Sequence, residues 1–215
     1  MRRRHGGRGR EASPLLGAGA AGGPEGFPVA PPPHTAAELS ALIGLLTGFP
    51  AMQPAGLPTR PGDELVTVAV GHGRDDALRA AAAAFAEEWR ARGGRVLATV
   101  DWPESAASWL RPARRLTAQG PRAWVVTGAV TGWAQMSRRL RHSTAWDPAR
   151  TFAFAALHDP RLRELAGPDA VRGLRGATAE GGTWEFGEEA GEHEGEGEGF
   201  FRPSVSSSRG RRGAP

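Results

Sequence analysis

The sequence contains no cysteine, lysine or tyrosine, and each absence removes a class of chemistry. Without cysteine there is no disulfide, no thiolate nucleophile, no Cys-ligated zinc and no lipid-modified cysteine. Without lysine there is no Schiff-base amine and no phosphate-loop lysine. All 27 basic side chains are therefore arginines, and against 23 acidic residues they leave a formal net charge of only +4. An all-arginine, Ala/Gly/Pro-rich chain is typical of a GC-rich genome, so codon usage explains the arginines better than a function does.

Long apolar runs are also missing. The chain begins with MRRRHGGRGR, but Pro14 and the surrounding glycines leave no continuous apolar stretch of about 7 to 15 residues, so we expect no signal peptide. No run approaches the roughly 20 apolar residues of a membrane span. The arginine-rich ends would attract nucleic acid electrostatically, but no aromatic residue is interleaved with them, so we expect no specific nucleic-acid partner.

Composition divides the chain into a folded part between two tails. Residues 1–34 and 187–215 combine glycine, proline, serine and charge with few large apolar groups, so we expect both to be disordered. Between them the pattern predicts an amphipathic helix over 35–49, a linker over 50–62 and an α/β domain over 63–186.

The helix over 35–49 carries both start and stop signals. Thr35 and Glu38 form a T-x-x-E capping box, and Gly48 with Pro50 ends the helical pattern. Its apolar stripe follows helical spacing and consists of Leu39, Leu42, Ile43, Leu46 and Phe49. The stripe must be covered, either by the domain itself or by a partner, and the second case predicts a protein-interaction module.

From residue 65 onward short apolar runs alternate with helical patterns. LVTVAV predicts a strand, and Asp75 or Asp76 caps the following helix, whose apolar positions are Leu78, Ala82, Phe85 and Trp89. Further strands are predicted over 95–101, 123–128 and 151–157, with helices between them. Pro112 should bend or split the helix that lies between the predicted strands 95–101 and 123–128. This alternation predicts a mostly parallel, doubly wound α/β sheet of about four strands in a three-layer αβα arrangement.

Patterns for metal binding and catalysis are missing. The six histidines include no pair at i, i+3 or i+4, and no G-x-S-x-G elbow occurs, so we expect no metal, no cofactor and no enzyme. A transferase on this sheet would need two carboxylates for a metal near the strand ends, and Asp75 with Asp101 is the only such pair. The loop from Gly71 to Arg74 is similar to a dinucleotide fingerprint, but Asp76 replaces the third glycine and would repel a pyrophosphate.

Ligands of open parallel sheets bind beyond the carboxyl ends of the strands, so the loops there hold the candidate site. His72 and Arg74 follow the first strand, where they are either solvated turn residues or an anion grip. Asp101 and Trp102 follow the second strand and form either a plain turn or a carboxylate and an indole for a ligand. After the third strand come two further candidates, Thr127 and Trp133, of which Trp133 serves equally well as a core residue.

Taken in order, several segments resemble one lobe of a type I periplasmic-binding-protein fold, as used by branched-chain amino-acid receptors of ABC transporters. These segments cover about 120 residues and include VTVAVGHGRDDALRAAAAAFAEEWRARGGRV, AWVVTG, WDPARTFAFAAL and GLRGATAEGGTW. The resemblance implies binding of a small polar, amino-acid-like metabolite without catalysis. A second lobe or a second chain would then supply the other wall of the cleft. It implies the cell envelope for a truncated receptor, whereas the visible sequence alone gives the cytoplasm by default.

Within this hypothesis the ligand contacts are His72, Arg74, Asp101, Trp102, Thr127 and Trp133. Arg74 would pair with an anionic group of the ligand and Asp101 with a cationic one. An indole, from Trp102 or Trp133, would close over the apolar part.

Overall fold

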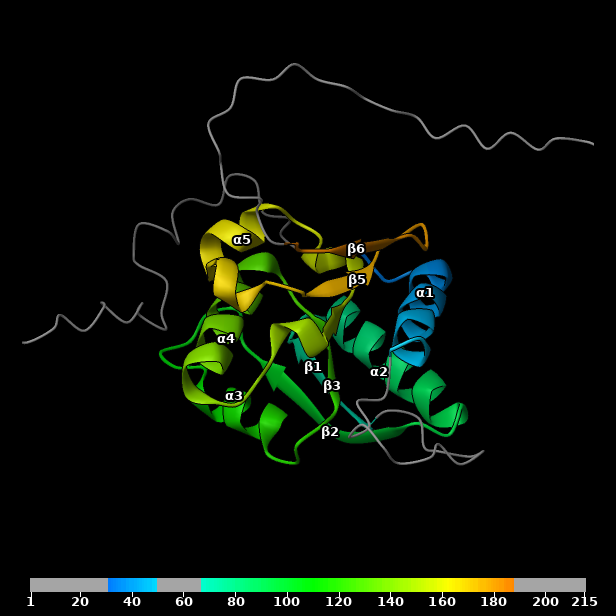
Figure 1. Cartoon of the computed structure of the whole chain (residues 1–215), viewed down its shortest axis with the longest axis horizontal. Helices are drawn as coiled ribbons and strands as arrows, with labels where there is room; N and C mark the ends of the chain where they lie inside the picture. The colour runs from blue at the N-terminus through cyan, green and yellow to red at the C-terminus, as the bar shows by residue number, and fades with distance from the viewer. Residues whose placement is uncertain (1–30, 50–66, 188–215) are drawn as a thin grey trace, which may run out of the picture.

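A mostly parallel sheet forms the centre of the molecule in the computed structural model, which describes residues 31–49 and 67–187. Its strands lie in the order β2-β1-β3-β4-β5-β6 (Figure 1). Their bounds are β1 Thr67–Gly73, β2 Arg95–Trp102, β3 Ala123–Thr127, β4 Thr151–Ala153, β5 Arg175–Ala177 and β6 Thr183–Glu185. The predicted linker 50–62 and the predicted tails, apart from residues 31–34 and 187, lie outside the described residues.

The α/β class and the parallel pairing are confirmed, but the predicted number of strands is wrong. Each neighbouring pair from β2 to β5 is parallel, and β6 returns antiparallel to β5. The two additional strands, β5 and β6, are each three residues long and lie in a glycine-rich segment. Three residues are too few to show the alternation of apolar and polar side chains that predicts a strand. The fourth strand is also shorter than predicted, because residues 155–157 form a 3₁₀ turn.

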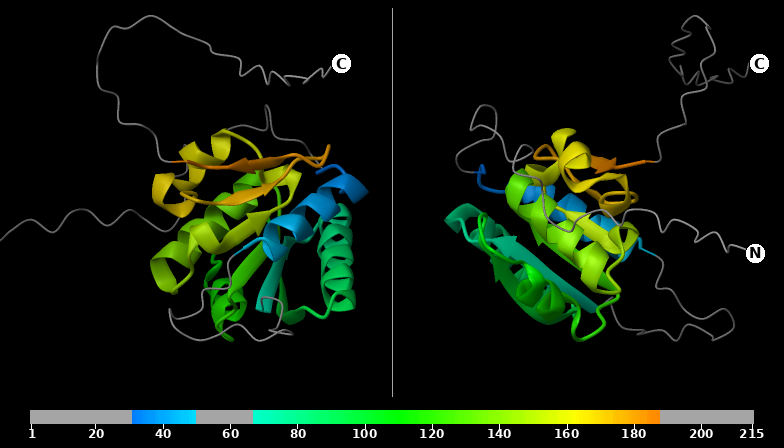
Figure 2. Two further views of the ribbon diagram at one scale, coloured as in Figure 1. Left: turned by 45° about the vertical axis from the view of Figure 1, so that its right-hand side comes forward. Right: turned by 90° about the vertical axis from the view of Figure 1, so that its left-hand side faces the viewer.

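Helices cover both faces of this sheet. α1 (Ala36–Thr47) and α2 (Asp76–Ala91) lie on one face, and α3 (Leu110–Thr117), α4 (Val130–Ser143) and α5 (Arg161–Ala166) lie on the other (Figures 1 and 2). The strand residues alternate between the two layers: Val68 and Val70 pack toward α2, whereas Ala69 packs toward α3 and α4. This alternation produces two separate cores, as a sheet buried on both faces requires.

The α2 boundaries follow from its end signals. Asp75 is the N-cap, and its side chain accepts a hydrogen bond from Ala77 N. At the other end Gly93 adopts a φ of +85°, a conformation that favours glycine. The missing side chain of Gly94 leaves room for the Trp89 indole, since a Cβ there would lie 2.3 Å from Trp89 Nε1.

Helix α1 covers the half of its sheet face that α2 leaves bare. α2 follows β1 and lies over β1 and β2, while α1 contacts β4 and β5. The Thr35–Glu38 capping box forms as predicted, and Leu42 and Leu46 are 0 % exposed within the shared core. The domain itself covers the centre of the 39–49 stripe, so the structure does not favour the alternative of a protein-interaction module that uses this stripe.

Pro112 neither bends nor splits a helix, which corrects the prediction made for it. α3 begins at Leu110, so the proline occupies the first helical turn. Proline is tolerated there because the first amides of a helix have no intrahelical acceptor.

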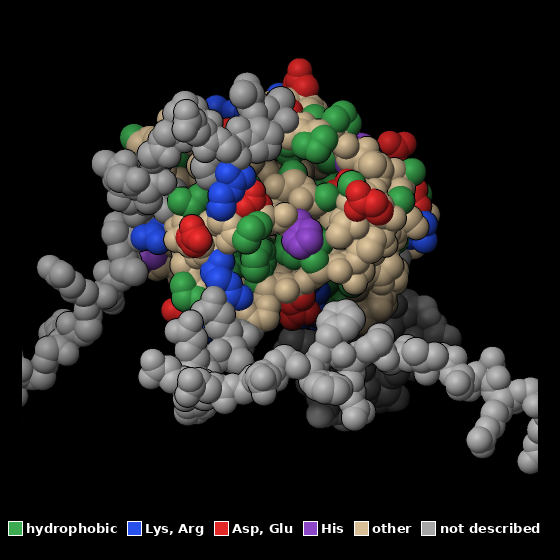
Figure 3. Space-filling model, turned by 90° about the horizontal axis from the view of Figure 1, so that it is seen from above, with side chains coloured by type: hydrophobic (Ala, Val, Ile, Leu, Met, Phe, Trp, Pro, Cys, Tyr) green, Lys and Arg blue, Asp and Glu red, His purple; other side chains and the backbone are tan. Residues whose placement is uncertain are grey.

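None of the helices that the structure describes is both long and apolar enough to cross a membrane. Figure 3 views the molecule from the side of β6, where charged side chains break up the apolar ones on the part that the described residues form. This face therefore shows no single broad apolar patch.

Candidate functional site

The carboxyl ends of β1, β2 and β3 bring three predicted site residues into one row. His72 is the register partner of Asp101 on β2 and of Thr127 on β3. Three loops that are far apart in the sequence therefore meet at this edge, as the parallel pairing predicts. His72 and Thr127 are buried, while Asp101 is half-buried.

Arg74 and Asp101 bind each other across this edge. Arg74 Nε donates a hydrogen bond to Asp101 Oδ2 over 2.7 Å, and the two side chains remain 61 % and 41 % exposed. This hydrogen bond lowers the pKa of Asp101. An exposed pair of this kind contributes at most about 1 kcal/mol, so a charged ligand can compete with it. The pair can thus offer both signs of charge at the rim.

Trp102 and Trp133 lie in the core below the edge. Both are fully buried, and their ring centroids are 5.5 Å apart, with Trp146 5.9 Å beyond Trp133. None of the three indole Nε1 atoms has a hydrogen-bond partner. In this conformation the indoles support the site from beneath and present no face to solvent.

A cavity of about 140 Å³ opens beside Thr127 on the α1 and α2 side of the edge. Apolar residues form most of its wall, and the polar members are Thr127, Glu38, His34 and Thr35. The apolar lining residues are Pro32, Pro33, Ala77, Leu78, Ala81, Phe154, Ala155, Ala156 and Ala179. Glu38 and His34 cannot be assigned to this cavity from the sequence, because both precede the first strand and no local motif connects them with the loops.

The carboxylate of Glu104 also lies at this edge of the sheet, beside the start of α4. A Cβ on Gly73 would lie 2.5 Å from Glu104 Oε1, and a Cβ on Gly132 would overlap Oε2, so two glycines make the space for this group. Desolvation raises the pKa of Glu104 to about 7, although the backbone N–H groups of Ala129 and Gly132 favour the charged form. The residue is exposed overall, but its carboxylate is inserted between the two glycines.

Glu104 should make stability depend on pH. Because its folded pKa lies above the ordinary value of 4.5, the folded state binds more protons than the unfolded state between these values. The free energy of unfolding should therefore fall as the pH rises from about 5 to about 7. Denaturant unfolding of the wild type and Glu104→Gln across this range checks it. The slope should be shallower in Glu104→Gln, and equal slopes would contradict the assignment to Glu104.

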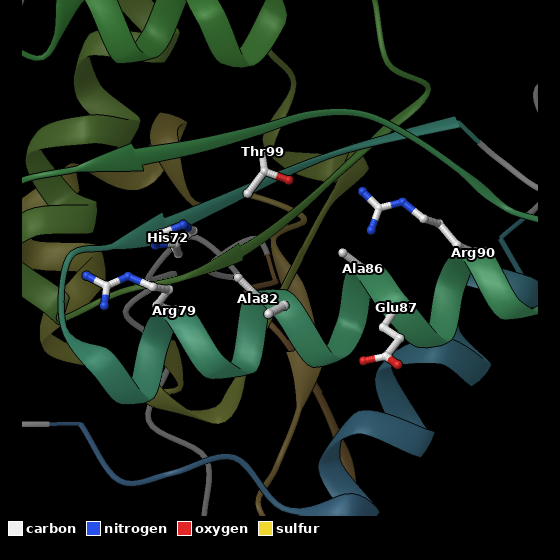
Figure 4. Close-up of a pocket in the computed structure, with 8 residues that line it drawn as sticks. His72, Arg79, Ala82, Ala86, Glu87, Arg90 and Thr99 are labelled. Atoms are coloured by element: carbon white, nitrogen blue, oxygen red, sulfur yellow. The ribbon is translucent and has the colours of Figure 1, made fainter.

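A wider hollow of about 520 Å³ lies between α2 and the edge strand β2 (Figure 4). Thr99 and His72 flank it on the sheet side, and alanines of α2 form its floor. Arg79 and Arg90 extend from opposite ends of the helix face, while Glu87 points away from the strand. Its polar groups do not converge on one point, which makes the Thr127 cavity the better candidate site.

The described residues hold no obvious metal centre. Within residues 31–49 and 67–187, no group of three or more histidine, aspartate or glutamate side chains could hold a metal ion. The two carboxylates considered for a transferase are engaged separately, since Asp75 caps α2 and Asp101 binds Arg74.

Solved structures with the same arrangement exist. A protein described as a branched-chain amino acid ABC transporter from Rhodospirillum rubrum superposes with a TM-score of 0.50 at 23 % identity, over 66 % of this chain and 36 % of the other. A substrate-binding periplasmic protein from Ralstonia solanacearum gives 0.52 at 20 % identity, over 70 % and 38 %. The chain has the fold of one lobe of a type I periplasmic binding protein.

This lobe corresponds to little more than a third of the length of those two proteins. The sequence matches no protein-family model and no curated protein. The likeness therefore establishes the fold, and the predicted resemblance to a periplasmic-binding-protein lobe is confirmed.

Proposed function

We propose that this chain is a ligand-binding module that holds a small polar metabolite at the carboxyl edge of its sheet. The observation that carries the proposal is the cavity beside Thr127, which lies where parallel sheets bind ligands. The solved structures with this fold include a substrate-binding periplasmic protein, which favours binding over catalysis. An amino acid is the leading ligand class, because the loops at this edge offer the Arg74 guanidinium and the carboxylates of Asp101 and Glu104.

The predicted contacts divide into three roles in this proposal. Thr127 lines the cavity, and Arg74 with Asp101 offers charges at the rim. Trp102 and Trp133 hold the strand ends from below, and His72 lies between this edge and the wider hollow. A second lobe or a second chain would contact the same edge and cover the rim.

Thermal-shift measurements against amino acids and sugars at millimolar concentration test the proposal. A ligand present at about ten times its Kd should stabilise the folded state by roughly 1.4 kcal/mol, which raises Tm by about 3 to 6 °C in a domain of this size. Asp101→Asn should weaken the response, whereas Asp169→Asn, in an exposed pair away from the edge, should leave it unchanged. No stabilisation by any compound would refute the proposal.

A further inference from the structure

Glu38 is a buried carboxylate that reaches the candidate site from α1, outside the alternating strands and helices of the lobe. The residue is 3 % exposed. One of its oxygens accepts a hydrogen bond from Thr35 N over 3.2 Å, and the other accepts one from Ala155 N. Glu38 therefore connects the start of α1 to the turn that follows β4, and it does so at the wall of the cavity.

The described residues balance the charge of this carboxylate only in part. Among the residues that the structure describes, neither an arginine nor a histidine forms an ion pair with Glu38. The amides at the start of α1 offset part of the charge. A carboxylate can accept about four hydrogen bonds, so the two that are formed leave acceptor positions open. A buried charge without a counter-ion is costly, which favours a cationic group beside it.

The size and lining of the cavity restrict what that cation can be. The volume of about 140 Å³ is close to that of the engineered cavity of about 150 Å³ that binds benzene in another protein, so the occupant has about six non-hydrogen atoms or fewer. Alanines, Leu78 and Phe154 form most of the wall and suit a short hydrocarbon chain. The Thr127 hydroxyl supplies a second hydrogen-bonding group.

We propose that this cavity binds a primary ammonium group on a short apolar chain, with the ammonium facing the Glu38 carboxylate and the Thr127 hydroxyl. The inference rests on the proposed function, since it names the ligand class of the same site. Residues 32–35 form part of the wall of the cavity. A carboxylate of the same size would face Glu38 and be repelled, and a neutral alcohol would gain no charge interaction.

Three compounds of one shape test the charge requirement on the full chain at neutral pH. Isobutylamine, isobutanol and isobutyrate are titrated by calorimetry, and Tm is recorded with each. We expect isobutylamine to bind and raise Tm, with at least tenfold weaker binding of the other two. Equal binding of isobutanol or isobutyrate would overturn the inference. Valine and valinol, added in parallel, show whether the amine is recognised alone or as part of an amino acid.

Variants assign the effect to Glu38. Glu38→Gln keeps a capping-box side chain, because glutamine serves at this position as glutamate does, and it should weaken isobutylamine binding at least tenfold. Glu87→Gln, which removes an exposed carboxylate from α2, is the matched control and should bind like the wild type. Unchanged binding by folded Glu38→Gln would overturn the assignment.

A second variant decides the question if Glu38→Gln fails to fold. Ala77→Leu places a larger side chain in the first turn of α2, where it fills the cavity and leaves Glu38 intact. It should abolish isobutylamine binding, and retained binding would overturn the inference. Sugars that bind while isobutylamine, valine and valinol all fail would refute the ammonium site and leave the proposed function standing. Failure of every compound would refute both.

Discussion

Leu42→Ala is expected to lower the free energy of unfolding by about 2 to 5 kcal/mol, the cost of deleting a fully buried leucine side chain. Leu42 lies on α1, is 0 % exposed and belongs to the core that α1, α2 and the sheet share. Chemical denaturation followed by circular dichroism measures the change. Leu42→Glu should cost more, since it buries an unpaired charge, and should prevent stable folding.

Leu45→Ala is the matched control on the same helix. Leu45 is only partly buried, so its truncation should cost less than half as much as that of Leu42. A Leu42→Ala protein with wild-type stability, or a two-step unfolding curve in which α1 melts first, would show that the helix is not part of the domain core.

The elements that the sequence predicted best are those with strong local signals. Helix α2 has an N-cap aspartate, an apolar stripe at helical spacing and two terminal glycines, and its bounds agree with that pattern. Strands β5 and β6 are different, because three residues beside glycines carry no periodicity of their own. Their pairing with each other, and that of β5 with β4, forms them, and no alternating pattern in the sequence marks this pairing.

Only the part of the candidate site that lies at the strand ends could be predicted from the sequence. Parallel strands that end at one edge placed His72, Asp101 and Thr127 together, and the register confirms that neighbourhood. Glu38 could not be predicted there. Its capping-box role was evident from local sequence, but its contact with Ala155 spans 117 positions and depends on where α1 docks. Local patterns identify such a residue, and tertiary packing decides which site it joins.

Substitution of Trp102 is the second change that we expect to lower the free energy of unfolding strongly. Its ring occupies the space above two glycines: a Cβ on Gly71 would lie 2.7 Å from the six-membered ring, and a Cβ on Gly128 would lie 3.1 Å from it. The ring is fully buried, and its Nε1 has no hydrogen-bond partner. The glycines and the tryptophan therefore fit as one unit at the ends of β1, β2 and β3.

Trp102→Ala should lower the free energy of unfolding by about 3 to 5 kcal/mol, as truncation of a buried aromatic side chain does. Trp102→Phe should cost less, because the phenyl ring keeps part of the volume and no indole hydrogen bond is lost. The two unfolding midpoints, measured with equal denaturant slopes, check this order. A tryptophan that served mainly as a ligand wall would instead tolerate both changes with small losses of stability.

Gly71→Ala tests whether the tight fit itself is the cause. In the wild type the added methyl group meets the Trp102 ring and should cost about 1 to 3 kcal/mol, the usual cost of overpacking. With Trp102→Phe in place the smaller ring leaves room, so the same change should cost at least 0.5 kcal/mol less, roughly the lower limit for coupled neighbours. Strictly additive costs in this double-mutant cycle would show that the ring and the glycine do not constrain each other. In that case the indole could move away from Gly71 and expose the strand ends to a ligand.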